Sequence, residues 1–296
     1  FSPDGTTLVS AGQDRTVRLW DVANNAPRAT LLGHTAAVRA VAYSPDGRLV
    51  ASADRAGQVL VWDAATGSRL RTLVGHDGIV DGVAFSPDGR LLASAGADRQ
   101  AIVWDAGTGE KRFELPGYGG PATELAFSGQ TLAVAGDDGN VALWDLAHPG
   151  AVRVLPASGE ALFAVAFTPD GHLLAAAGAD RVITLWDVRQ GVRVAALNEH
   201  VDPIRHLAFT DGGRTLVSAG YDRVAILWDV AQQGATVRLT GHAGSLYGVA
   251  VSPDGQRIAS AGEDEAILVW DRSRMPLIGH TDRVSDVAFA PDGRQI

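Results

Sequence analysis

Apolar residues alternate with polar or small residues in short runs along the chain, and turn residues separate these runs. Residues 80–86 (VDGVAFS) and 90–95 (RLLASA) are two such runs, with Pro-Asp-Gly between them. Alternation with β-branched and aromatic residues predicts strands, and the Pro-Asp-Gly turn joins them into a hairpin. Two further runs, at residues 100–105 and 111–115, each follow a Gly-containing turn. The pattern predicts units of four short antiparallel strands, and no segment shows a helical period.

The same unit recurs along the chain, and each copy contains Trp-Asp. All seven Trp residues are followed by Asp, and successive Trp positions are separated by 42, 42, 40, 42, 42 and 42 residues. A period of this size corresponds to one supersecondary unit, which cannot bury its hydrophobic face alone and must stack on its neighbours. Because no linker interrupts the repeat, residues 1–296 are predicted to form a single domain.

Paired Gly-His and Trp-Asp bracket each unit, and with them the chain resembles the WD-repeat family of β-propellers. Gly-His lies at 33–34, 75–76, 241–242 and 279–280, with Glu-His at 199–200 as a variant. The resemblance implies an all-β, seven-bladed β-propeller of four-stranded antiparallel blades. It also implies that each repeat supplies the outer strand of one blade and three inner strands of the next. Residues 284–290 are therefore expected to pair with the N-terminal blade and close the ring without an unpaired inner edge.

A Ser, a His and an Asp recur at fixed distances from Trp, a combination that also serves hydrolases. The copies are His76, Ser94, Asp98 and Trp104; His200, Ser218, Asp222 and Trp228; His242, Ser260, Asp264 and Trp270; and, across the ring closure, His280, Ser10, Asp14 and Trp20. An enzyme has no use for four identical triads. The resemblance implies instead a structural hydrogen-bond network between the loop before the first strand and the turn after the second. We therefore predict no catalytic site.

Three blades depart from this network, counting blades in chain order. Blade two has Ala56 where Asp is expected, blade four has Tyr118 and Val134, and blade five has Ser158 and Ala176. Blade four also lacks two residues in its first hairpin, where FSGQ replaces FSPDGR. Each lost hydrogen bond is worth roughly 0.5–1.5 kcal/mol, so the weakest part of the ring is predicted at blades four and five.

Charge and composition exclude several classes of function. The chain has 25 Lys and Arg against 34 Asp and Glu, a net charge of -9, which repels nucleic acid and anionic membranes. It contains no Cys and no apolar run of transmembrane length, so disulfides and thiolate metal sites are excluded and a cytoplasmic location is expected. His148, His172 and His206 lack the spacing of a metal site, and no cofactor is predicted. The sequence begins at Phe1 inside a motif, which suggests a fragment of a longer polypeptide.

The resemblance implies that a protein or peptide binds on the face formed by the loops around the central channel. Residues expected there differ between blades, unlike the scaffold. Aromatic and Arg side chains are frequent anchors of interfaces, which selects Phe163, Arg205, Tyr221 and Tyr247 in blades five to seven, with Arg39, Arg55 and Arg283 extending the surface toward an acidic ligand. Asp81 and Asp137 oppose such a ligand. Alternatively, one or two of the anchors only pack against neighbouring loops.

The leading hypothesis is a non-catalytic protein-interaction or scaffold module. The alternative is a regulatory or sensor domain of a larger bacterial signalling enzyme, such as an NTPase, kinase or protease, and the Ala-, Arg- and Gly-rich composition fits a bacterial source. A hydrolytic propeller would need polar residues that converge in the channel in one copy only, and the sequence analysis identifies none.

Overall fold

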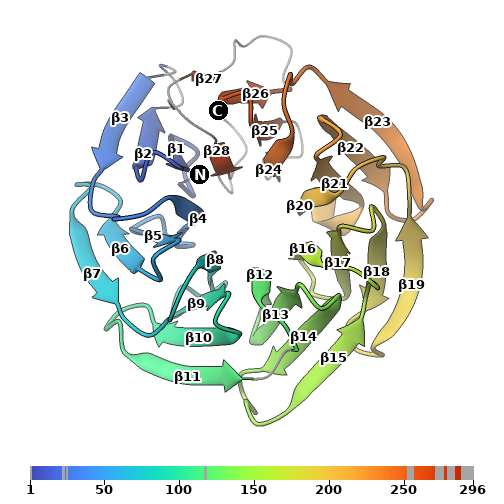
Figure 1. Cartoon of the computed structure of the whole chain (residues 1–296), viewed down its shortest axis with the longest axis horizontal. Coiled ribbons are helices and arrows are strands. Elements are labelled where there is room, and N and C mark those ends of the chain that lie inside the picture. Colours follow the sequence, from blue (N-terminus) through green and yellow to red (C-terminus); the bar gives the residue numbers. More distant parts are fainter. Residues whose placement is uncertain are drawn as a thin grey trace.

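The computed structural model describes residues 2–21, 24, 26–116, 119–251 and 257–270, together with the backbones of two strands at 277–278 and 284–287. Within these residues, 28 strands form seven four-stranded antiparallel sheets, the blades, arranged in a ring around a central channel (Figure 1). This confirms the predicted seven-bladed β-propeller. The described residues contain no helix with the length and hydropathy needed to cross a membrane.

Each blade has four strands, ordered from the innermost, beside the channel, to the outermost, at the circumference. Blade one consists of β28 (Val284–Val287), β1 (Thr7–Gly12), β2 (Val17–Asp21) and β3 (Ala26–Leu31). Blade two consists of β4 (Val38–Tyr43), β5 (Leu49–Asp54), β6 (Val59–Asp63) and β7 (Arg69–Leu73). Blade three consists of β8 (Val80–Phe85), β9 (Leu91–Gly96), β10 (Gln100–Asp105) and β11 (Lys111–Pro116). Blade four consists of β12 (Ala122–Ser128), β13 (Thr131–Gly136), β14 (Asn140–Asp145) and β15 (Val152–Pro156).

Blades five to seven follow the same order. Blade five consists of β16 (Leu162–Phe167), β17 (Leu173–Gly178), β18 (Ile183–Asp187) and β19 (Val192–Leu197). Blade six consists of β20 (Ile204–Thr210), β21 (Thr215–Gly220), β22 (Val224–Asp229) and β23 (Gly234–Thr240), with a short 3-10 turn at Asp211–Gly213. Blade seven consists of β24 (Leu246–Val251), β25 (Ile258–Gly262), β26 (Ala266–Val269) and β27 (Leu277–Ile278).

The ring is closed by pairing between the two ends of the chain. Strand β28 pairs antiparallel with β1, with Ser10 opposite Val287 and Ala11 opposite Asp286. The C-terminal strand thus occupies the innermost position of the N-terminal blade, beside the channel (Figure 1). This confirms the predicted closure, in which β28 pairs with the inner edge of β1.

The hydrophobic core lies between adjacent blades. In one cluster, Ala51 and Ala53 of blade two pack against Leu92, Ile102 and Trp104 of blade three. These five side chains are at most 2% exposed. The second strands are rich in Ala, and their small side chains allow neighbouring sheets to approach closely, as close-packed interiors require. Each blade therefore buries its apolar side chains only by packing against the adjacent blades. This packing fixes the relative positions of the loops on both faces of the ring.

Candidate binding site on the loop face

A hydrogen-bonded chain of four side chains recurs at the base of the loops. In blade three, Trp104 Nε1 donates to Ser94 Oγ over 2.9 Å, and His76 Nε2 lies 2.8 Å from the same oxygen. The other imidazole nitrogen, His76 Nδ1, lies 2.8 Å from Asp98 Oδ2. Asp98 also accepts the backbone N–H of Gln100, so the chain of contacts ties the loop before the first strand to the turn after the second.

The same geometry occurs in blades six and seven. His200 lies 2.7 Å from both Asp222 Oδ2 and Ser218 Oγ, and Trp228 Nε1 donates to Ser218 over 2.8 Å. In blade seven, the His242–Asp264, His242–Ser260 and Trp270–Ser260 distances are 2.9, 2.8 and 3.0 Å. In blade one, Trp20 Nε1 donates to Ser10 Oγ over 2.8 Å and Asp14 accepts from Thr16, whereas His280 lies outside the described residues.

Burial determines what these side chains can do. Ser94, Ser218 and Ser260 are fully buried, so no substrate reaches their hydroxyl groups. Burial also lowers the pKa of His34 and His76 below 6.5, although their Asp partners oppose the shift. The neutral imidazole then donates a hydrogen bond from Nδ1 to the carboxylate and accepts one at Nε2 from the Ser hydroxyl group. The Ser oxygen in turn accepts a hydrogen bond from Trp. The polar atoms of these four linked side chains are thereby paired, an arrangement suited to holding loops in place.

Blade two corrects the expectation that Ala56 leaves its network without a carboxylate. Asp54, two residues earlier at the end of β5, places Oδ2 2.8 Å from His34 Nδ1. His34 Nε2 lies 2.7 Å from Ser52 Oγ, which accepts from Trp62 Nε1 over 2.7 Å. The sequence signal was present, because the equivalent residue is Gly in the other six units.

Blades four and five contain different side chains at these positions. In blade five, Ser158 Oγ donates directly to Asp180 Oδ2 over 2.7 Å, and Trp186 Nε1 donates to Thr184 Oγ1 over 3.1 Å. Ala176 and, in blade four, Val134 occupy the Ser position and are fully buried. Tyr118 lies outside the described residues. The substitutions therefore replace part of the network instead of simply removing it.

The predicted partner-binding residues lie around one side of the channel. Phe163, Arg205 and Tyr247 belong to the innermost strands β16, β20 and β24 of three consecutive blades (Figure 1). Arg205 Nη1 donates to the Phe163 carbonyl oxygen over 2.9 Å. Tyr221, on the turn after β21, contacts Tyr247 edge-to-face with ring centroids 5.5 Å apart. The structure therefore brings the four residues together as two contacting pairs.

The exposure of these residues is unequal. Phe163, Arg205 and Tyr221 are half-buried, whereas Tyr247 is only 8% exposed. Tyr247 therefore mainly supports the ring of Tyr221, and the other three side chains offer the accessible area. A half-buried aromatic group that is already held by its neighbours loses little rotamer freedom on binding.

The basic extension of this surface is partly neutralised. Arg39 Nε donates to Asp81 Oδ1 over 2.9 Å, and the two side chains are 23% and 17% exposed. These residues occupy equivalent positions in adjacent blades, so the predicted cation and the carboxylate expected to oppose it form one ion pair. Arg55 is exposed on the turn after β5, and Arg283 lies outside the described residues.

Sequence reasoning missed two ionisable residues in the channel. Glu124 on β12 and His206 on β20 line the same cavity of about 300 Å³, together with apolar residues such as Val83 and Val249. The sequence analysis did not identify these two residues, which line the channel wall in blades four and six. The two residues occupy equivalent positions, which are filled by Ala or Gly in the other described blades two to seven. The described residues contain no group of three His, Asp or Glu side chains that could hold a metal ion.

Comparison with known proteins agrees with the repeat structure. The family model described as WD domain, G-beta repeat matches eight segments that span almost the whole chain, at residues 1–21, 25–63, 67–105, 109–145, 150–187, 191–229, 234–271 and 273–296. A search of curated proteins gave no match.

Proposed function

Because this chain belongs to the WD-repeat family, whose propellers commonly mediate protein–protein interactions, we propose that it is a non-catalytic module that binds a protein or peptide on its loop face. The observation that carries the proposal is the cluster of Phe163, Arg205, Tyr221 and Tyr247 at the channel mouth. It combines the residue types that dominate interface energetics with contacts that already hold the Arg205 guanidinium and the Tyr221 ring.

The contrast between scaffold and surface supports the same assignment. The His–Ser–Asp–Trp network recurs with nearly the same distances in blades two, three, six and seven. The innermost positions around the channel instead carry Arg39, Asp81, Thr123, Phe163, Arg205 and Tyr247. A repeated scaffold with a different side chain in each blade presents one asymmetric surface, which is what recognition of a single partner requires.

The partner is proposed to be a protein or peptide, including another domain of the same parent polypeptide, and not nucleic acid or a membrane. A net charge of -9 disfavours the last two classes. The buried serines support the non-catalytic assignment, because their hydroxyl groups are inaccessible to substrate.

A capture experiment with matched variants tests this proposal. The purified chain serves as bait in a lysate of its source organism, beside an Arg205→Ala/Tyr221→Ala double variant that retains the buried Tyr247. An Arg193→Ala variant on the outer strand β19 is the control for loss of an exposed cation elsewhere. A protein captured by the wild type and the control, but not by the double variant, is the expected result. Equal capture by all three would place the binding site elsewhere.

A further inference from the structure

The outermost strand of blade four differs from its counterparts in its pairing register. In blades one, two, three, five and six, the ladder between the third and fourth strands shifts at the Trp residue, which is the mark of a β-bulge. In blade four the ladder between β14 and β15 is regular, with Leu143 opposite Arg153 and Trp144 opposite Val152. Among the described blades whose outer ladder reaches the Trp, β15 alone lacks the bulge.

The difference arises from where each blade accommodates one additional residue. In blade five, Leu185 pairs with Ala195, the same separation as between Leu143 and Arg153, but Trp186 then pairs with Arg193. The extra residue therefore lies within the outer strand of blade five, whereas in blade four it lies in the longer loop 146–151. Bulges twist an edge strand away and interrupt its hydrogen-bonding pattern, which protects it from pairing with another chain. The edge of β15 lacks this protection.

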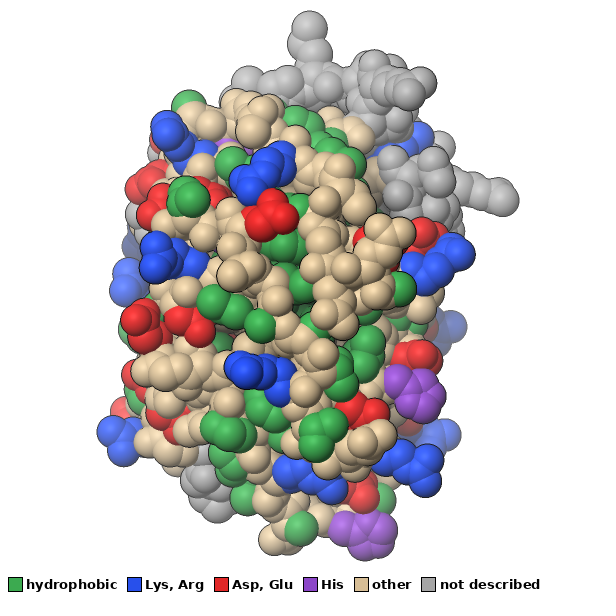
Figure 2. Space-filling model, turned by 90° about the vertical axis from the view of Figure 1, so that its right-hand side faces the viewer, with side chains coloured by type: hydrophobic (Ala, Val, Ile, Leu, Met, Phe, Trp, Pro, Cys, Tyr) green, Lys and Arg blue, Asp and Glu red, His purple; other side chains and the backbone are tan. Residues whose placement is uncertain are grey.

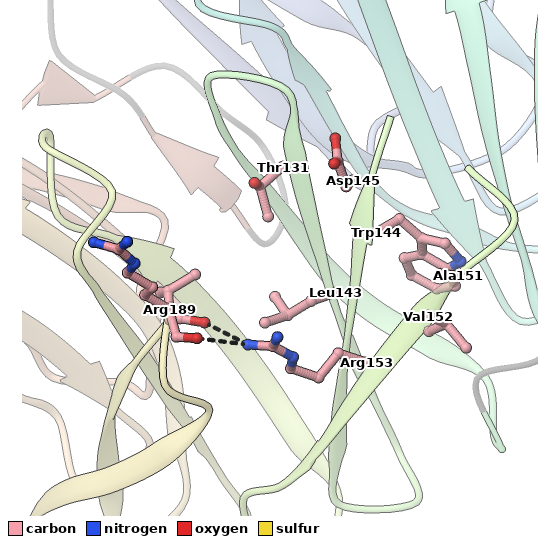
Figure 3. A pocket seen from close by; sticks show the side chains of 9 residues that line it. Thr131, Leu143, Trp144, Asp145, Ala151, Val152, Arg153 and Arg189 are labelled. Atoms are coloured by element: carbon pink, nitrogen blue, oxygen red, sulfur yellow. Dashed lines mark hydrogen bonds between the residues drawn. The ribbon is translucent and has the colours of Figure 1, made fainter. Parts of the chain in front are cut away.

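The side chains of β15 are apolar as well, although Val192 and Val194 of the bulged strand β19 are similarly exposed, so the register and not the valines distinguishes β15. Val152 and Val154 are 43% and 48% exposed, so the strand presents apolar groups beside its open edge. Arg153 does not shield the edge, because its Nη1 donates across to the carbonyl oxygens of Val188 and Arg189 in blade five, over 2.9 and 3.1 Å (Figure 3). Pro156 ends the strand and limits further pairing to Val152–Leu155.

A groove of about 510 Å³ lies beside this edge, between blade four and the turn after β18 (Figure 3). Leu143, Trp144, Val152 and Val188 give it an apolar lining. Its charged residues are Arg153, the exposed Arg189 and one acid, Asp145. The Asp145 carboxylate already accepts from the Ala147 backbone and lies 3.0 Å from His148 Nδ1. The groove is thus more basic than the chain as a whole, whose net charge is -9.

We propose that the edge of β15 is a second docking site, which takes an extended acidic and apolar segment of a partner protein as an added strand. The segment pairs with Val152–Leu155, inserts an apolar side chain into the groove and places a carboxylate beside Arg189. Backbone hydrogen bonds supply affinity in this mode, and the groove and Arg189 supply specificity. The site is on the circumference of the ring, so it is separate from the loop-face site proposed above and does not depend on it.

Peptide binding to the full chain tests the proposal. The probe is a fluorescein-labelled synthetic peptide in which glutamate and valine alternate, and its fluorescence anisotropy is followed during titration. We expect saturable binding that weakens by about tenfold or more in the Val154→Lys variant and in the Arg189→Glu variant. The same peptide with N-methylated amides, and a peptide of alternating lysine and valine, should not bind.

The matched control is Val237→Lys on β23, an outer strand with the bulge and with a similarly exposed valine. Figure 2 shows the side of the ring that carries β19 and β23, where apolar side chains are interspersed with charged ones. Val237→Lys should bind the acidic peptide like the wild type. Absence of saturable binding, equal weakening by Val237→Lys, or equal binding of the lysine peptide would overturn the proposal. Self-association that Val154→Lys abolishes would overturn it in favour of a second copy as the occupant.

Discussion

Blades three and five both bury a tryptophan indole N–H, but they satisfy it with different side chains. In blade three, Trp104 donates to Ser94, which is linked through His76 to Asp98. In blade five, Trp186 donates to Thr184 on its own strand, and Ser158 contacts Asp180 directly. The turn carboxylate is retained in both blades and accepts a backbone N–H from residue 100 or 182. The comparison teaches that the scaffold requires paired buried polar groups, and that the histidine is one way to pair them.

The comparison predicts the largest loss for removal of the histidine that links the complete network of blade three. His76→Ala leaves Ser94 and Asp98 without their imidazole partner at a buried site, so the free energy of unfolding should fall by about 3 kcal/mol. The midpoint of urea unfolding measures this change. His172→Ala, at an exposed histidine, is the control. A loss no larger than that of the control would show that the network does not stabilise blade three.

Acidification should lower the stability of the chain by an intermediate amount. The histidines of blades two and three cause this loss, and blade five has no histidine at this position. Burial lowers the pKa of His34 and His76 in the folded chain below the value of 6.5 that applies after unfolding. Between the folded pKa and 6.5 the unfolded chain binds more protons, so stability is complete above pH 6.5 and decreases as the pH falls through this window. The melting temperature should therefore fall from about pH 7 to about pH 5. A His34→Asn/His76→Asn variant should show a weaker dependence on pH than the wild type, and an unchanged dependence would contradict the assignment.

Loss of the smaller contact in blade five should cost less. Ser158→Ala removes the hydrogen bond to Asp180 and the one that Ser158 Oγ accepts from the Glu160 backbone N–H. The expected loss is about 1 kcal/mol, because the carboxylate keeps its backbone donor and the Glu160 N–H is exposed to water. Urea unfolding under the conditions used for His76→Ala gives a direct comparison. A loss equal to that of His76→Ala would mean that the two arrangements are energetically equivalent and that the histidine adds no stability.

The smallest change is expected when the carboxylate of blade two is moved to the common position. Asp54→Gly alone should destabilise the chain by about 2 kcal/mol, because His34 loses its carboxylate partner and keeps Ser52. Asp54→Gly/Ala56→Asp should return the free energy of unfolding to within about 0.5 kcal/mol of the wild type. Failure of the second substitution to restore stability would show that Asp54 has a further role at that site.

The spacing of Trp-Asp predicted a stacked repeat, and the resemblance to WD-repeat proteins implied the propeller and the closure of its ring. A unit of about 42 residues cannot bury its apolar face alone. The staggered repeats that the resemblance implies required one strand from the C-terminal region to complete blade one. Strand β28 occupies that position. The local alternation also predicted four strands in each blade, because side-chain direction along a strand depends on neighbouring residues only.

The sequence determined the strands, the repeat and the residue types on the loop face, since each depends on local pattern or on comparison between copies. Tertiary structure decided which side chains meet. Asp54 takes the role expected at position 56, because its carboxylate lies within hydrogen-bonding distance of His34 although it occupies a different position in the repeat. Glu124 and His206 face one cavity, and Tyr221 meets Tyr247, because the closed ring brings residues from different blades together around the channel. The missing bulge of β15 likewise depends on whether the extra residue is accommodated in the loop or in the strand, which pairing with β14 decides.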